Sequence, residues 1–329
     1  MKRFHPCMVT GEAEAIARMT FNFQSMDSLP IGVTSDSVMA AFQPFLCGTV
    51  EQGRRRRLIR RIRYNAVKRA ARRIIGRDAV TANRGKAMIT DEYEGAWSRG
   101  YSAYDLAVGC RKPEPWLYRD MPVMADRSGV PRFRSVILSG VIGALKPSRV
   151  LEVGCGNGIN LLLLANSFPD IAFTGLELTE SGNRVAKEMQ AKPMLPDALS
   201  RYAPGEQADP QAFRRIDFRK GDATAMPFES NAFDLVFTVL SVEQMERVRD
   251  KALSEIARVS GGHVLNLEPF AEANRSPWRR LHVFARDYFR GSVEDLPRYG
   301  LEPVWATMDY PQEVQLGAAL VLSAKRKEA

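Results

Sequence analysis

The stretch that decides the fold is Val150-Leu-Glu-Val-Gly-Cys-Gly-Asn-Gly158, in which a mostly apolar run leads directly into three glycines at alternate positions. We predict a buried strand over residues 149–153 and a helix over residues 159–167. Glycines in the turn between them let the backbone take positive φ angles and approach a ligand closely. The first turn of the helix offers free N–H groups to an anionic group. The sequence therefore predicts a ligand site where this strand ends.

Outward from the glycine turn, predicted strands alternate with predicted helices. Further helices are expected over residues 135–145, 181–190, 247–259 and, more briefly, 293–299. Further strands are expected over residues 171–178, 216–219, 233–238, 263–267, 303–309 and 318–324, and the proline-rich residues 191–213 are expected to form an inserted loop. Such alternation predicts a parallel sheet with helices on both faces. The expected fold class is α/β, with a Rossmann-like, doubly wound and mostly parallel sheet of seven strands.

Acidic residues stand at the ends of the next two strands. Glu177 lies in Thr174-Gly-Leu-Glu-Leu-Thr179, and Asp222 lies in Gly221-Asp-Ala-Thr-Ala-Met-Pro-Phe228. Glu152 precedes the first glycine by two residues, so the turn reads E-x-G-x-G-x-G instead of the G-x-G-x-x-G of dinucleotide-binding turns. These three motifs, in this order, resemble those of the class I S-adenosylmethionine-dependent methyltransferases, in their small-molecule branch of ubiquinone/menaquinone type ("type 11").

The resemblance implies S-adenosyl-L-methionine as the cofactor. No metal site is expected, because no two of the four cysteines have metal-ligand spacing and the three histidines do not complete a convincing set. The resemblance assigns cofactor binding to Glu152, Gly154, Cys155, Gly156, Gly158, Glu177, Leu178, Asp222, Ala223 and Thr238. In such a site Glu177 would accept hydrogen bonds from both ribose hydroxyls, and Asp222 would accept one from the adenine amino group, because a carboxylate offers several lone pairs. The N–H of Ala223 would reach a ring nitrogen, and Thr238 would lie near the methionine part. The motifs cover about residues 130–270 and do not reach residues 1–90.

Two glutamates are the catalytic candidates. Methyl transfer is an in-line displacement, so the enzyme must align the acceptor and exclude water. An oxygen or carbon acceptor also needs a base. Glu243 follows the fourth strand and Glu268 follows the fifth, so both are expected near the reacting atoms. The alternative for Glu243 is a structural role, in which its negative charge stabilises the start of a helix through the helix dipole. Glu268, which precedes Pro269, is less easily explained by structure alone.

The positive charge of the chain is concentrated in its first part. Residues 1–87 hold 17 basic and 6 acidic residues, whereas residues 88–329 hold 30 basic and 32 acidic residues. We predict a basic, partly disordered N-terminal extension over 1–87 and a methyltransferase domain over 88–329, with the cofactor core at about 130–270. Residues 1–50 show no period and are expected to be loosely structured.

Within the extension, an apolar row predicts an amphipathic helix over residues 54–77. Leu58, Ile62, Ala66, Ala70 and Ile74 recur at every fourth residue among arginines. Such a helix can lie on an anionic membrane with Leu58, Ile62 and Ile74 in the interface, contact RNA phosphates, or simply pack on the domain. These alternatives stay open, with lipid contact ahead of RNA.

An aromatic cluster stands ahead of the cofactor core. It comprises Tyr93, Trp97, Tyr101, Tyr104, Trp116 and Tyr118. We expect either a lid over the site or packing in the core.

The sequence around the fourth strand favours a small-molecule, lipid or glycan acceptor. Enzymes that methylate exocyclic amines of nucleic acids usually carry Asn/Asp-Pro-Pro-aromatic there, whereas this chain has Thr238-Val-Leu-Ser241. The second candidate functions are an RNA methyltransferase that uses the basic helix and a non-catalytic, cofactor-binding regulatory module. The four cysteines are expected to be free thiols. No apolar run is long enough to span a membrane. A cytoplasmic location, with peripheral contact to a membrane as an option, is the expectation.

Overall fold

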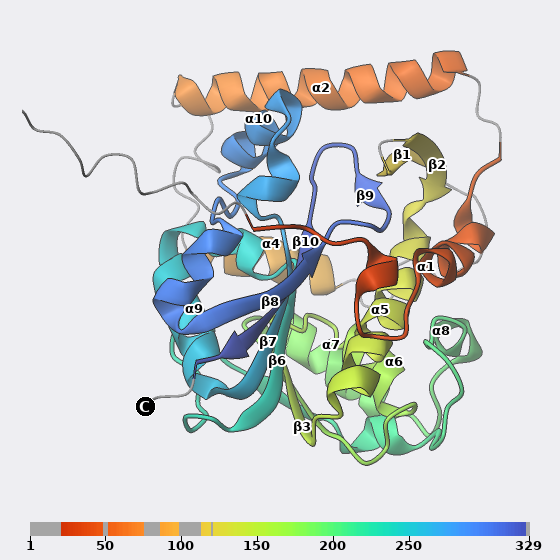
Figure 1. The fold of residues 1–329 in the computed structure, drawn as a ribbon, viewed down its shortest axis with the longest axis vertical. Helices are drawn as coiled ribbons and strands as arrows, with labels where there is room; N and C mark the ends of the chain where they lie inside the picture. The colour runs from red at the N-terminus through yellow and green to blue at the C-terminus, as the bar shows by residue number, and fades with distance from the viewer. Residues whose placement is uncertain (1–20, 49–51, 76–85, 99–112, 120, 327–329) are drawn as a thin grey trace, which may run out of the picture.

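The structure is a computed structural model that describes residues 21–48, 52–75, 86–98, 113–119 and 121–326 (Figure 1). Of the predicted aromatic cluster, Tyr101 and Tyr104 lie outside the described residues. Cys155 is a buried free thiol, but Cys47 is disulfide-bonded, so the expectation of free thiols is wrong for Cys47.

A seven-stranded sheet forms the centre of the molecule (Figure 1). Its strands are β3 (Arg149–Val153), β4 (Ala172–Glu177), β5 (Asp217–Lys220), β6 (Phe233–Val239), β7 (Ser260–Glu268), β8 (Leu301–Thr307) and β10 (Ala319–Lys325). Their order across the sheet is β5-β4-β3-β6-β7-β10-β8. Strands β3 to β7 pair in parallel, and β10 is antiparallel to both of its neighbours. The predicted α/β, doubly wound and mostly parallel sheet is confirmed.

Helices cover both faces of this sheet (Figure 1). They are α5 (Val130–Leu145), α6 (Ile159–Ala165) and α7 (Glu180–Gln190), with α9 (Arg249–Val259) on the opposite face; the short α8 (Asp197–Ser200) lies in the predicted insertion. Successive side chains of a strand point to opposite faces. Accordingly Val150 packs with α5 and α6 in one hydrophobic core, and its neighbour Leu151 packs with α9 in the other.

Residues 21–48 are packed on the domain, which corrects the expectation of a loosely structured segment. Helix α1 (Ser35–Phe42) begins after Thr34, whose hydroxyl accepts a hydrogen bond from the Ser37 N–H. The ring of Phe42 is fully buried, with ring centroids 5.7 Å from Trp116 and 5.4 Å from Phe133. The segment therefore shares the main core. The proposed division of the chain at residue 87 stays a prediction.

One carboxylate ties this N-terminal segment to distant parts of the chain. Asp309 accepts hydrogen bonds from the Ser25 hydroxyl at 3.0 Å, the Met26 N–H at 3.1 Å and the Ser35 hydroxyl at 2.9 Å. Arg119 donates to the same group from Nε at 2.7 Å. The Arg119 guanidinium and these donors hold the pKa of Asp309 well below its usual range, so the carboxylate stays ionised.

Two elements beside the main sheet were not predicted. Strands β1 (Pro113–Tyr118), β2 (Met121–Asp126) and β9 (Gln312–Glu313) form a small sheet in the order β2-β1-β9. Helix α10 (Pro277–Arg286) begins after Ser276, whose hydroxyl accepts a hydrogen bond from the Arg279 N–H.

Helix α2 (Gln52–Ile74) confirms the predicted amphipathic helix, and it packs along α10 (Figure 1). Ala66 and Ala70 of the predicted apolar row are buried in this contact. At the end of α2, Arg73 donates to Asp287 at 2.8 Å and stacks on the Phe284 ring. The middle of the apolar row therefore faces the protein, where the small alanines allow close packing, whereas Ile74 at its end is exposed.

Replacing Phe42 tests whether the N-terminal segment belongs to the fold. We expect Phe42→Ala to lower the free energy of unfolding by about 3–5 kcal/mol, because the change leaves a cavity among buried rings. Val38 is buried in the same helix, and Val38→Ala should also lower the free energy of unfolding, by a smaller amount. Chemical denaturation measures both values. An unchanged midpoint for Phe42→Ala, equal to that of the exposed control Asp36→Ala, would show that the segment does not support the core.

Candidate active site

The glycine turn after β3 has the conformation that its sequence predicts. Gly156 takes a φ of +55°, which side-chain-bearing residues rarely adopt. The N–H groups of Gly154 and Cys155 donate to the carbonyl of Leu176 at 2.8 and 3.1 Å, so the turn is fastened to the end of β4. A Cβ on Gly154 would meet Ser241, and one on Gly158 would meet Phe218, which leaves Gly156 as the glycine that faces away from the sheet.

Glu177 joins the turn to the next strand. One oxygen accepts a hydrogen bond from the Gly156 N–H at 2.8 Å. The other accepts from the N–H of Thr179 at 3.0 Å and from its hydroxyl at 2.5 Å. Glu177 is buried, and Leu178 beside it is half-buried. The structure therefore brings the first two predicted motifs into direct contact.

The third motif lies beyond the end of β5. Asp222 accepts a hydrogen bond from the Thr224 N–H at 2.9 Å, and its other oxygen accepts from Lys86 Nζ at 2.6 Å. The Asp222 side chain is 28% exposed to solvent, whereas Ala223 is buried. Because β5, β4 and β3 are adjacent and parallel, Asp222, Glu177 and the glycine turn lie at one edge of the sheet.

Two further predicted residues are more deeply placed. Glu152 is buried, and one of its oxygens accepts a hydrogen bond from Asn160 at 2.6 Å. Its second oxygen has no hydrogen-bond partner among the described residues, and burial raises the pKa of Glu152 to about 8. Thr238 is buried too, and its hydroxyl accepts a hydrogen bond from Asn266 at 2.9 Å.

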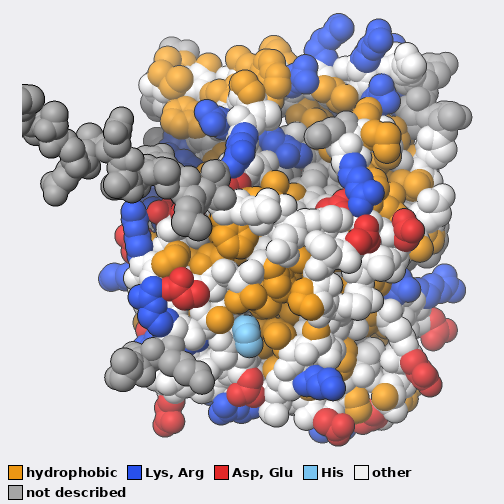
Figure 2. Space-filling view, in the orientation of Figure 1, with side chains coloured by type: hydrophobic (Ala, Val, Ile, Leu, Met, Phe, Trp, Pro, Cys, Tyr) orange, Lys and Arg blue, Asp and Glu red, His pale blue; other side chains and the backbone are white. Residues whose placement is uncertain are grey.

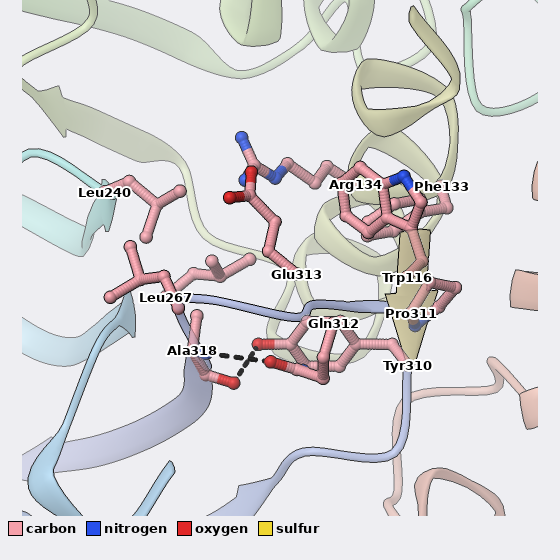
Figure 3. Close-up of a pocket in the computed structure, with 11 residues that line it drawn as sticks. Trp116, Phe133, Arg134, Leu240, Leu267, Tyr310, Pro311, Gln312, Glu313 and Ala318 are labelled. Atoms are coloured by element: carbon pink, nitrogen blue, oxygen red, sulfur yellow. Dashed lines mark hydrogen bonds between the residues drawn. The ribbon is translucent and has the colours of Figure 1, made fainter. Parts of the chain in front are cut away.

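A narrow pocket opens beside the ends of β6 and β7 (Figure 3). Most of its lining is apolar, and the residues are Trp116, Phe133, Arg134, Leu240, Leu267, Tyr310, Pro311, Gln312, Glu313, Leu316 and Ala318. Figure 3 shows Leu240 and Leu267 on one side and the rings of Trp116 and Phe133 on the other. The Tyr310 hydroxyl donates to the Ala318 carbonyl at 2.8 Å, so this phenol is engaged by the protein.

Glu268, a predicted catalytic residue, holds backbone in place. It is buried at the end of β7, where one oxygen accepts hydrogen bonds from the N–H groups of Ser241 and Val242 and the other accepts one from Glu243. Burial raises the pKa of Glu268 to about 7, against the lowering effect of these donors. The carboxylate thus fixes the segment after β6, and a role as base stays a prediction.

Glu243, the second predicted catalytic residue, is placed differently. It is buried, and one oxygen accepts a hydrogen bond from Gln244 at 2.5 Å. The other oxygen has no hydrogen-bond partner among the described residues. Burial and the nearby charge of Glu268 raise the pKa of Glu243 to about 8, and the charges of Glu313 and Arg134, which line the pocket, also act on it. Of the two glutamates, Glu243 has an oxygen without a hydrogen-bond partner among the described residues; this oxygen is buried, and Glu243 does not itself line the pocket.

Three site contacts come from a helix that the motifs did not indicate. In α4 (Lys86–Trp97), Lys86 reaches Asp222, and Glu94 accepts hydrogen bonds from the N–H groups of Glu180 and Ser181 at 2.6 and 2.9 Å. Trp97 packs on Gly156, since a Cβ there would lie 2.5 Å from the indole. The aromatic cluster was the one sequence signal for this helix, and its lid interpretation fits these contacts.

Comparison with known proteins agrees with this geometry. Residues 151–265, which run from β3 into β7, match the family model described as a methyltransferase domain. Residues 151–265 therefore form a methyltransferase domain. The methyltransferase domain includes the glycine turn, Glu177, Asp222 and Glu243, and Glu268 follows it directly.

Two curated relatives share parts of this domain. The chain is 30% identical over 134 residues to the fatty-acid O-methyltransferase of Mycolicibacterium smegmatis. This match covers 40% of this chain and 41% of that protein. It is 29% identical over 182 residues to the phthiotriol/phenolphthiotriol dimycocerosates methyltransferase of Mycobacterium tuberculosis. That match covers 53% of this chain and 59% of that protein. The chain thus spans about half the length of these relatives.

A solved structure is also similar to this chain. It is magnesium protoporphyrin IX methyltransferase from Synechocystis PCC 6803, at 13% identity and a TM-score of 0.47, and the match covers 74% of this chain and all of that one. Among the described residues, no helix is long and apolar enough to cross a membrane.

The residues of the methyltransferase domain offer groups that suit the polar parts of S-adenosylmethionine. Gly156 has no side chain, although Trp97 packs on it, and Asp222, at the same edge of the sheet, has a partly exposed carboxylate that Lys86 contacts. The unpartnered oxygen of Glu152 is a buried acceptor that suits an ammonium group. Glu177 uses one oxygen for the turn and the other for Thr179, and a carboxylate has capacity for further donors such as ribose hydroxyls.

Proposed function

We propose that this chain is an S-adenosylmethionine-dependent methyltransferase that methylates a lipid or another apolar small molecule at a membrane surface. The observation that carries the proposal is the placement of the glycine turn, Glu177 and Asp222 on three adjacent parallel strands. In open α/β sheets, ligands bind at this edge. The apolar pocket lies at the same edge, at the ends of β6 and β7.

The residues of the cofactor site divide the ligand among them. Glu177 would hold the ribose hydroxyls, Asp222 and the Ala223 N–H the adenine, and Glu152 the ammonium group of the methionine part. The cofactor, when bound, supplies a methyl group on a sulfonium, and the neutral thioether of S-adenosylhomocysteine is the leaving group. The protein then has to align the acceptor and keep water out.

The pocket favours an apolar acceptor. Its walls are mainly aromatic and aliphatic, and such walls favour an acyl or alkyl chain over a sugar. The cavity has a volume of about 20 Å³, so its side chains would have to move apart to admit such a chain. The two curated relatives have names that refer to fatty acids and to phthiotriol dimycocerosates, which supports a lipid acceptor. Arg134 and Glu313 are the charged residues of the lining, and they would contact the polar end of the acceptor.

Glu243 is our candidate for the base. In its ionised form, its unpartnered Oε2 would take the proton of an acceptor hydroxyl while the oxygen of that hydroxyl attacks the methyl group. Glu268 would serve by holding the backbone of Ser241, Val242 and Glu243 in position. A pKa of about 8 leaves Glu243 mostly protonated at neutral pH, so transfer to a hydroxyl should speed up as the pH rises.

A radiochemical assay tests both the acceptor class and this base. Full-length protein with methyl-labelled S-adenosylmethionine should label long-chain alcohols or fatty acids, and not sugars or RNA. With an alcohol acceptor, kcat should rise with pH through about 8, and Glu243→Gln should lower it by roughly 10²- to 10⁴-fold and remove the rise.

The exposed Glu229→Gln serves as the matched control and should behave as the wild type. Label that appears in RNA and in none of the lipids would contradict the proposed acceptor. An unchanged pH profile in Glu243→Gln would contradict the proposed base.

The outer face of α2 supports a location at a membrane surface. Leu58, Ile62 and Ile74 were expected in the interface, but Leu58 and Ile62 are half-buried in the structure, and their assignment is corrected. Ile74 is exposed as expected, and its spacing places it in an apolar stripe on one face with Tyr64 and Val67. The exposed fractions of Tyr64, Val67 and Ile74 are 64%, 47% and 74%.

The charge around this stripe matches anionic headgroups. Helix α2 contains eleven Lys and Arg residues and no Asp or Glu. Trp278 of α10 is also exposed, and Arg63 of α2 stacks on its ring at 5.0 Å. Figure 2 shows apolar and basic side chains together along the edge of the molecule that α2 occupies. Apolar residues among arginines suit the boundary between headgroups and acyl chains.

Vesicle binding tests this surface. Full-length protein should sediment with vesicles that contain phosphatidylglycerol, less well at high salt, because the attraction is partly electrostatic. We expect the double variant Val67→Ser, Ile74→Ser to bind several-fold more weakly, and Arg60→Glu, Arg61→Glu to lose most of the binding. Val304→Ser, an equally exposed valine on β8, is the matched control. Equal vesicle binding by all four proteins would contradict a membrane role, and tighter, salt-sensitive binding to RNA would favour the RNA alternative.

A further inference from the structure

Helix α4 places one contact on each of the three segments that make the cofactor site. Lys86, at its start, donates to Asp222 Oδ2 at 2.6 Å. Glu94 accepts hydrogen bonds from the first N–H groups of α7, directly after the Glu177 segment. Trp97, at its end, packs on Gly156 of the glycine turn. The helix thus runs along the whole length of the site.

Two of these contacts use the groups that a cofactor needs. The indole of Trp97 lies against Gly156 on the side where a side chain would project, with three ring carbons 2.5–3.1 Å from an added Cβ. A ligand that approaches the backbone of Gly156 from that side must occupy the same space. At the other end, Lys86 Nζ takes the Asp222 oxygen that is not used by the Thr224 N–H. An adenine amino group would compete for this oxygen.

Helix α4 lies on the surface of the protein. None of its residues is buried, although Trp97 and Tyr93 are half-buried and lie with ring centroids 6.1 Å apart. A helix of 12 residues has little stability of its own in water, so α4 depends on its contacts with the rest of the chain. Segments with few buried contacts open at low free-energy cost.

We propose that α4 is a built-in competitor of the cofactor, in which Trp97 and Lys86 occupy contacts on Gly156 and Asp222 that S-adenosylmethionine must take over. This inference rests on the proposed cofactor site. The contact of Glu94 with α7 involves neither Gly156 nor Asp222, so it can persist and act as the pivot about which α4 moves. Binding of the cofactor is therefore coupled to displacement of α4.

The sign of the effect on affinity separates a competitor from a cap that contacts the bound cofactor. When only a fraction of the protein is open, the apparent dissociation constant equals the intrinsic one divided by that fraction, so removing the closed state lowers it. We expect Trp97→Ala and Lys86→Ala each to tighten binding of S-adenosylmethionine to the full chain, by about three- to tenfold if the closed state dominates. Isothermal titration calorimetry measures these values.

Two matched controls accompany these variants. Lys86→Arg keeps a cation beside Asp222 and should bind as the wild type does, and Trp278→Ala removes an exposed tryptophan from α10 and should leave the affinity unchanged. Tryptophan fluorescence gives a second readout. Adding S-adenosylmethionine should change the emission of the wild type and of Trp278→Phe, and this change should be largely lost in Trp97→Phe.

The outcomes distinguish this inference from the proposed function on which it rests. Tighter binding in Trp97→Ala and Lys86→Ala supports the competitor. Weaker or unchanged binding in both, with clear binding by the wild type, overturns the competitor and leaves the cofactor site standing. Absence of binding in the wild type and in every variant overturns the cofactor site and the inference together.

Discussion

The hydrogen bond from the Gly156 N–H to Glu177 is the interaction on which the site depends. Glu177 lies at the end of β4, and its second oxygen accepts hydrogen bonds from the N–H and the hydroxyl of Thr179, the N-cap residue of α7. One buried carboxylate thus fixes the glycine turn after β3, the end of β4 and the start of α7 relative to one another. Removing it would leave buried N–H groups without an acceptor, at a cost of about 1–3 kcal/mol for each.

A similar arrangement recurs three strands across the sheet. Glu268, at the end of β7, accepts three backbone N–H groups from the segment after β6. This places Glu243, with its unpartnered oxygen, near the charged residues of the apolar pocket. Glu177, on the side of the proposed cofactor site, and Glu268, on the side of the proposed acceptor pocket, therefore fix backbone in the same physical way. The parallel sheet brings the two sides together because all these strands end at one edge.

The sequence predicted the elements whose signal is local. The glycine turn, Glu177 and Asp222 were predictable because short motifs next to buried strands report backbone geometry directly. Helix α1 was missed because its eight residues span too few turns to show a period, and Phe42 is buried only by contact with distant rings. The apolar row at every fourth residue of α2 was recognised, but whether it faces α10 or a membrane depends on tertiary packing. The same limit applies to Glu268, whose backbone partners come from another strand, and to Lys86, Glu94 and Trp97 of α4.

The most direct test of the central claim is the affinity of the purified full chain for S-adenosylmethionine, compared between the wild type and Glu177→Ala by calorimetry. The account predicts one site per chain in the wild type and a loss of affinity of about 5- to 150-fold in Glu177→Ala, from the hydrogen bonds to ribose and the fixed turn. Glu180→Ala, an exposed glutamate three residues away, should retain the wild-type affinity. Equal affinity in Glu177→Ala and the wild type would contradict the account.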